Sequence, residues 1–98
     1  MARQKLEAAA VNEAMRELPG WALSGDGNAI LRTYTFRDFS EAFGFMARAA
    51  LAAEKLDHHP DWSNVYKTVA VKLNTHDAGG LTELDFKLAR KMDRCAGV

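Results

Sequence analysis

The chain has 98 residues, of which 48% are hydrophobic and 27% are charged, a length and composition that suit a single domain over residues 1–98 with its own core. Thirteen basic and thirteen acidic side chains cancel to a formal net charge of zero, so the chain lacks the electrostatic signature of a protein that binds nucleic acid or an anionic membrane. No segment approaches the roughly 20 apolar residues of a membrane span. The lone Cys95 permits no internal disulfide, so we expect a protein of the reducing cytoplasm.

The first third of the chain is predicted to form a helix and two strands. Apolar residues recur at three- and four-residue spacing over residues 4–18, which predicts a helix that ends at Pro19-Gly20. A short strand over 21–23 and a longer strand over 29–37 follow, and turn-forming residues at 24–28 separate them.

The middle of the chain carries the most clearly defined helix. Asp38 fits its N-cap and Glu41 follows at the spacing of a capping box, while Pro60 requires the helix to end near residue 57 or 58. Phe45 is interpreted as a subunit contact rather than a solvent-exposed residue, and a place in the core stays open as an alternative. The apolar stripe predicted to face the core comprises Phe39, Ala42, Phe43, Met46, Ala49, Ala50 and Ala53.

The last third of the chain is predicted to add two strands and a helix. Alternating apolar and polar residues predict strands over 62–66 and 69–74, joined by a tight turn at 67–68. Gly79-Gly80 then breaks the chain before a helix over 82–94. The element order α-β-β-α-β-β-α predicts an α+β fold, with a four-stranded antiparallel sheet and the helices packed on one face.

The three histidines of the chain fall in two short polar segments, with His58 and His59 at the end of the second helix and His76 just beyond a strand. Imidazole exchanges protons near neutral pH. Carbonyl groups at a helix end favour a charged His58, and Glu54, one turn earlier on the same helical face, is expected to do the same. His76, beside Asp77, would supply a second imidazole, so that an acid and a base act together. We therefore predict catalysis by proton transfer without a cofactor.

Other interpretations of these residues stay open. The histidine pair could be a solvated helix cap, whereas a zinc site is disfavoured because adjacent histidines point in different directions, so we predict no metal. Asp85 lies three residues after Thr82, and a capping role in the last helix is favoured for it. Trp62 suits the wall of a pocket and the edge of the core equally well, and Glu54 suits a surface carboxylate or a supporting partner.

The same residues give the chain a specific likeness to a known family. A pattern that runs from Glu54 through His58-His59-Pro60, Tyr66 and His76 to Asp85 resembles that of the pterin-4a-carbinolamine dehydratases, also called 4a-hydroxytetrahydrobiopterin dehydratases. The likeness covers residues 21 to about 89. It is extended by Phe43-Gly44-Phe45-Met46, Asn64-Val65-Tyr66 and Gly80-Leu81-Thr82.

The resemblance implies an activity and a set of site residues. The activity is loss of water from 4a-hydroxytetrahydrobiopterin to give the quinonoid dihydropterin, which recycles tetrahydrobiopterin after hydroxylation of aromatic amino acids. The resemblance implies that His58, His59 and His76 surround the pterin. We hypothesise that His58 and His76 donate protons to the leaving hydroxyl, and that His59 orients the ring or accepts the proton of the ring nitrogen. The implied substrate-binding residues are Asp57, His58, His59, Asn74, Thr75, His76 and Asp77, with Glu54, Trp62 and Asp85 in support.

Alternative functions and the assembly state stay open in the sequence. Some animal members of the family also bind the dimerisation region of a homeodomain transcription factor, so a non-catalytic dimerisation or transcriptional coactivator module of the same fold is the main alternative. A similar pocket for another pterin, for instance in a molybdopterin-linked pathway, is a further one. Asn74 stands where the family more often has serine, which leaves that side-chain contact open. The apolar second helix and Phe45 predict a homodimer or homotetramer.

Overall fold

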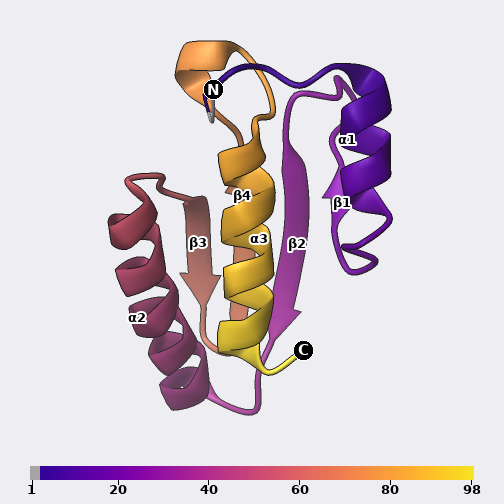
Figure 1. Ribbon diagram of the computed structural model, residues 1–98. Helices are drawn as coiled ribbons and strands as arrows, with labels where there is room; N and C mark the ends of the chain where they lie inside the picture. The colour runs from indigo at the N-terminus through magenta and orange to yellow at the C-terminus, as the bar shows by residue number, and fades with distance from the viewer. Residues whose placement is uncertain (1–2) are drawn as a thin grey trace.

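The computed structural model describes residues 3–98, which form one layer of β-sheet covered by helices (Figure 1). The strands lie in the order β1-β2-β4-β3, and neighbouring strands are antiparallel. The predicted order α-β-β-α-β-β-α and the α+β fold with helices on one face are confirmed. The elements are α1 (Ala8–Met15), β1 (Ala22–Leu23), β2 (Ile30–Thr35), α2 (Phe39–Leu56), β3 (Asp61–Val65), β4 (Thr68–Leu73), the 3₁₀ turn η1 (His76–Ala78) and α3 (Glu83–Ala96).

The hairpin of β3 and β4 turns one residue earlier than predicted. The strand pairing ends at Val65 and Thr68, so the tight turn falls on residues 66–67 rather than 67–68. Tyr66 has a φ of 53°, the left-handed conformation that two-residue hairpin turns need at their first central position. Because β3 also begins earlier than predicted, only a short loop separates it from α2.

Helix α2 packs on the sheet with only part of the predicted stripe: Ala42, Ala49 and Ala53 are buried as predicted, whereas Phe39, Phe43 and Ala50 are exposed. Asp38 caps the helix as expected, because its carboxylate accepts a hydrogen bond from the amide of Glu41 at 2.9 Å. Phe45 is completely buried, with its ring centroid 4.7 Å from that of Tyr34, whereas Phe43 is 58% exposed. The interpretation of Phe45 as a subunit contact is therefore wrong. The buried residues of α2 are Ala42, Phe45, Ala49 and Ala53.

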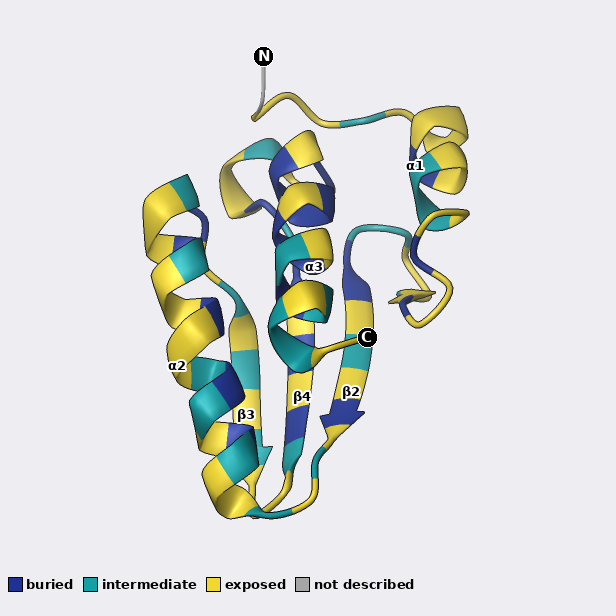
Figure 2. Ribbon diagram, turned by 60° about the horizontal axis from the view of Figure 1, so that its bottom comes forward, coloured by how far each residue is buried: buried dark blue, intermediate teal, exposed yellow. Residues whose placement is uncertain are grey.

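The predicted stripe merged two neighbouring rows of apolar residues. Residues three and four apart share one side of a helix, so the row that contains Phe45 packs on the sheet and the row that contains Phe43 points away from it. Figure 2 shows buried and exposed residues alternating along α2 in this way. Within residues 3–98, no helix is long and apolar enough to cross a membrane. The outer face of α2 comprises the exposed residues Phe39, Phe43, Ala47 and Ala50, while Met46 packs against the core.

Helix α1 is shorter than predicted at both ends. It spans Ala8–Met15 rather than residues 4–18, and Glu7 at its N-cap supplies no side-chain hydrogen bond. Before the helix the chain is extended, and the amide of Leu6 donates to the carbonyl of Leu81 at 2.8 Å. This bond to a distant loop replaces the helical bonding that the spacing predicted. Residues 3–7, here called the N-terminal strap, consequently run across the end of the molecule that holds η1 (Figure 1).

A polar cluster fixes the C-terminal half of α3 on the sheet. One carboxylate oxygen of Asp93 accepts hydrogen bonds from the indole of Trp21 at 3.1 Å, from the guanidinium of Arg32 at 3.0 Å and from the hydroxyl of Tyr34. Burial and the adjacent carboxylate raise the pKa of Tyr34 well above its usual value, so the hydroxyl stays a donor. This anchoring holds α3 in place, with its opposite end beside the histidine segments.

Candidate active site

Two loops at one end of the sheet bring the histidines together. The loop of residues 57–60 follows α2 and the segment of residues 74–80 follows β4, and both lie at the upper end of the molecule in Figure 1. All seven residues that were predicted to bind substrate border one cavity between these loops. The cavity has a volume of about 230 Å³ and is lined by Arg3, Asp57, His58, His59, Asn74, Thr75, His76 and Asp77.

His58 is held from behind by a buried carboxylate. The residue is 5% exposed, and its Nε2 lies 2.6 Å from Oδ1 of Asp85, which is 0% exposed. Oδ2 of Asp85 accepts hydrogen bonds from the hydroxyl of Thr75 and the amide of Thr82, both at 2.9 Å. The Thr82 and Asp85 contacts form the capping box of α3. Asp85 therefore caps the helix, as its spacing predicted, and also binds the buried histidine.

This contact determines how His58 can exchange protons. With Asp85 as a carboxylate, Oδ2 accepts from Thr75 and Thr82, and Oδ1 accepts a hydrogen bond from Nε2 of His58. The ring then has Nδ1 as an acceptor when it is neutral and as a donor when it is protonated. A carboxylate in this position orients the imidazole and stabilises the protonated ring as it forms. The arrangement is the one that a general acid or base requires.

Glu54 contacts His59 and not His58, which corrects the prediction made from helical spacing. Oε1 of Glu54 lies 2.9 Å from Nε2 of His59, and both side chains are exposed. The helical spacing fails because Asp57 adopts a left-handed conformation, with φ of 53°, and ends α2 before the histidines are reached. An exposed pair of this kind contributes little to stability. It holds the ring of His59 at the cavity by one nitrogen.

His76 begins the 3₁₀ turn η1, which the sequence pattern did not indicate. Its carbonyl accepts a hydrogen bond from the amide of Gly79, whose φ of 73° favours glycine. A β-bridge between Thr75 and Gly80 closes the turn. The side chain of His76 is exposed, while the neighbouring Thr75 is buried and belongs to the Asp85 network. The turn thus carries an exposed imidazole that lines the same cavity as the buried one.

The three residues predicted to support the site do not line the cavity. Glu54 and Asp85 act on it through the histidines that they contact. Trp62 is half-buried on β3, pairs with Val71 of β4 and packs against the hydrophobic core, so it lies at the edge of the core rather than in the pocket wall. Among residues 3–98, no three histidine, cysteine or acidic side chains are arranged to hold a metal ion.

Arg3 borders the cavity although nothing in the sequence singled it out. Its guanidinium donates to the backbone carbonyl of Asp57 at 2.7 Å and lies 3.4 Å from the Asp57 carboxylate. The two residues are 54 positions apart in the chain. Their contact depends on the extended path of the N-terminal strap, so no local spacing could have revealed it.

Comparison with known proteins identifies close relatives of the whole chain. The family model described as pterin 4 alpha carbinolamine dehydratase matches residues 4–95. Two curated relatives, both named as provisional pterin-4-alpha-carbinolamine dehydratases, come from Chelativorans sp. (strain BNC1), with 64% identity over 98% of each chain, and from Mesorhizobium japonicum, with 62% identity over 99% of each chain.

Solved structures share the fold of the chain. A crystal structure described as a transcriptional coactivator/pterin dehydratase from Brucella melitensis is 55% identical, with a TM-score of 0.93 over 96% of this chain and 100% of that chain. A pterin dehydratase-like protein described as a RuBisCO assembly factor in the alpha-carboxysome is 20% identical, with a TM-score of 0.69 over 80% of this chain and 90% of that chain. The second likeness concerns the fold alone.

Proposed function

Because the chain belongs to the pterin 4 alpha carbinolamine dehydratase family, we propose that it removes water from 4a-hydroxytetrahydrobiopterin to give the quinonoid dihydropterin. The observation that carries the proposal is the convergence of His58, His59 and His76 on one cavity, with a buried carboxylate behind the first of them. The reaction would recycle tetrahydrobiopterin for a hydroxylase. We place it in the reducing cytoplasm, with which the free Cys95 is compatible.

The proposed reaction needs two proton transfers and no change of oxidation state. The bond between C4a and the hydroxyl oxygen breaks as that oxygen receives a proton and leaves as water. N5 loses its proton as the double bond between C4a and N5 forms. A proton donor at the hydroxyl and an acceptor at the nitrogen are therefore sufficient, and each positioned transfer is typically worth about 10²–10⁴-fold in rate.

The proposed roles follow from where each imidazole lies. His58 and His76 donate to the leaving hydroxyl, and the Asp85 carboxylate supports this role for His58 because it stabilises the protonated ring. His59 orients the pterin or accepts the proton of N5. Its exposure supports the second of these roles, since water can carry the accepted proton away.

A direct assay tests the proposed function. Carbinolamine generated by an aromatic amino acid hydroxylase is supplied to the purified protein, and formation of the quinonoid dihydropterin is followed by ultraviolet absorbance. We expect the protein to accelerate dehydration well above the spontaneous rate. A rate that does not exceed the spontaneous one would reject the proposal and favour a non-catalytic dimerisation or coactivator module.

The outer face of α2 supports the proposal that the protein is a homodimer or homotetramer. Phe39 and Phe43 are 50% and 58% exposed, and their ring centroids lie 6.0 Å apart. None of the four residues that make up this face is charged, and exposed Glu54 continues the same side one turn later. Aromatic residues are typical of interface cores, and an uncharged patch can pair with its own copy around a two-fold axis.

Replacing Phe43 with glutamate is expected to halve the assembly, from a homodimer to a monomer or from a homotetramer to a dimer. The new carboxylate would have to be buried without a partner in the interface, which is energetically costly. Sedimentation equilibrium measures the mass. Leu31→Glu is the matched control, because Leu31 is 38% exposed and lies on the face of β2 turned away from the helices, so this variant should keep the wild-type mass. A monomeric wild-type protein at micromolar concentration would contradict the proposal.

A further inference from the structure

We infer that Arg3 is a positioning residue of the candidate active site, which it serves by clamping the backbone at Asp57 and thereby the loop that carries His58 and His59. The inference rests on the proposed function for its link to substrate. Arg3 lies before residue 4, where the match to the family model begins, and it donates to the carbonyl of Asp57 at 2.7 Å.

The clamped residue is the point at which α2 ends and the histidine loop begins. Asp57 has φ of 53° and ψ of 42°, a left-handed conformation that is unfavourable for a residue with a side chain. The amide of His58 donates to the carbonyl of Ala53 at 3.1 Å and completes this terminal turn. A charged donor on the carbonyl of Asp57 holds the turn closed from outside. The direction in which His58 and His59 leave the helix therefore depends on Arg3.

The N-terminal strap also binds the second loop of the site. The amide of Leu6 donates to the carbonyl of Leu81 at 2.8 Å, just beyond η1. Lys5 packs directly on Gly80, because a Cβ atom placed on that glycine would lie only 2.8 Å from Cε of the lysine. One extended segment thus joins the loop of His58 and His59 to the segment that carries His76.

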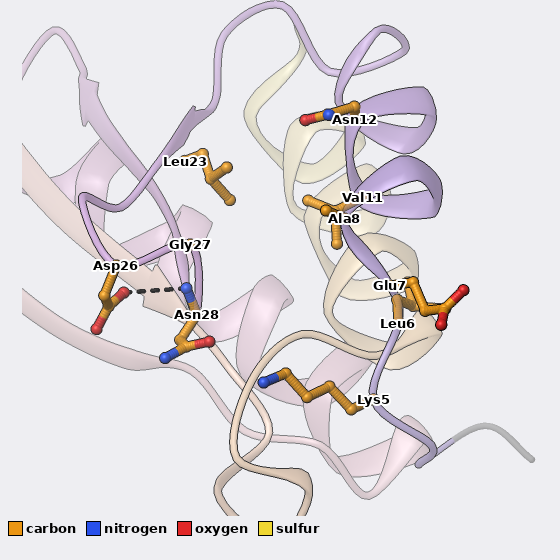
Figure 3. A pocket seen from close by; sticks show the side chains of 10 residues that line it. All are labelled: Lys5, Leu6, Glu7, Ala8, Val11, Asn12, Leu23, Asp26, Gly27 and Asn28. Atoms are coloured by element: carbon orange, nitrogen blue, oxygen red, sulfur yellow. Dashed lines mark hydrogen bonds between the residues drawn. The ribbon is translucent and has the colours of Figure 1, made fainter.

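Arg3 can be removed without disturbing the core, since its own side chain is largely exposed and the core contact of the strap is made by Leu6. A separate cavity of about 440 Å³ lies between the strap, α1 and the turn before β2, and Lys5 extends across it toward Asn28 (Figure 3). The side chain of Arg3 is 45% exposed. Loss of its contacts is therefore expected to loosen the histidine loop locally while leaving the fold intact.

The Arg3→Ala variant tests this role through two readouts. Loss of a hydrogen bond to a charged donor should let the terminal turn of α2 open about tenfold more often, which native-state hydrogen exchange measures at the amide of His58. Substrate binding weakens in proportion to the fraction of protein in which the loop is closed, so if the wild-type loop is open for about a tenth of the time, KM should rise about twofold. The value of kcat should stay within about twofold, because bound substrate holds the loop closed.

Gln4→Ala is the matched control, since Gln4 is an exposed residue of the same strap and should keep wild-type exchange and KM. Wild-type exchange at His58, or a wild-type KM, in Arg3→Ala would overturn the inference. If the wild-type protein shows no dehydration, the proposed function fails, and the exchange measurement alone then decides whether Arg3 clamps the loop.

Discussion

Replacing either His58 or His76 with alanine is expected to lower the rate of pterin dehydration by about 10²–10⁴-fold. Each change removes a proton donor that the proposed mechanism places at the leaving hydroxyl. Proton transfer occurs only in the transition state, so kcat should fall while KM changes little. Stopped-flow absorbance with freshly generated carbinolamine measures both constants after subtraction of the spontaneous reaction.

The two variants control for each other because their environments differ. His58 is buried against Asp85, so its loss also disturbs the fold, whereas His76 is exposed and its loss reports on chemistry alone. His59→Ala should raise KM if this residue orients the ring and lower kcat if it accepts the proton of N5. Full activity in both His58→Ala and His76→Ala would reject the assignment.

Periodicity predicted the fold best where one side of an element is polar. In α3, Leu84, Leu88 and Met92 recur every four residues and all three are buried, because charged residues occupy the opposite side of the helix. The two apolar rows of α2 gave no such contrast. Spacing therefore could not show which row packs on the sheet, and the aromatic residue furthest from the predicted stripe, Phe45, is the one that fills the core.

The gathering of seven of the eight cavity residues was predictable from the sequence, while Arg3 was not and the partners of the histidines were only partly so. The seven sit in two short polar segments that the order of helices and strands brings to one end of the sheet. Glu54 pairs with His59 because Asp57 adopts a left-handed conformation. The position of Pro60 predicted that the helix ends near this residue, but it did not predict this left-handed turn. Arg3 contacts Asp57 because the N-terminal strap is extended, whereas the spacing of apolar residues predicted a helix from residue 4.

Replacing Asp85 with alanine is expected to destabilise the protein by about 3–5 kcal/mol, because several buried hydrogen-bond donors lose their shared acceptor. The change leaves His58 buried without its partner and removes the carboxylate that accepts from Thr75 and from the amide of Thr82. Urea unfolding followed by fluorescence of the two tryptophans measures the free energy of unfolding. Dehydration should fall as well, because His58 loses the group that orients it.

Asp85→Asn separates the two roles of this residue. Asparagine is close to aspartate in shape and its oxygen can still accept from the amide of Thr82, so part of the helix cap survives and the loss of stability should be smaller, about 1–3 kcal/mol. The amide is uncharged, so it cannot stabilise the protonated ring of His58, and dehydration should fall about as far as in Asp85→Ala. A folded Asp85→Asn protein with the wild-type rate would mean that the carboxylate serves only to cap α3.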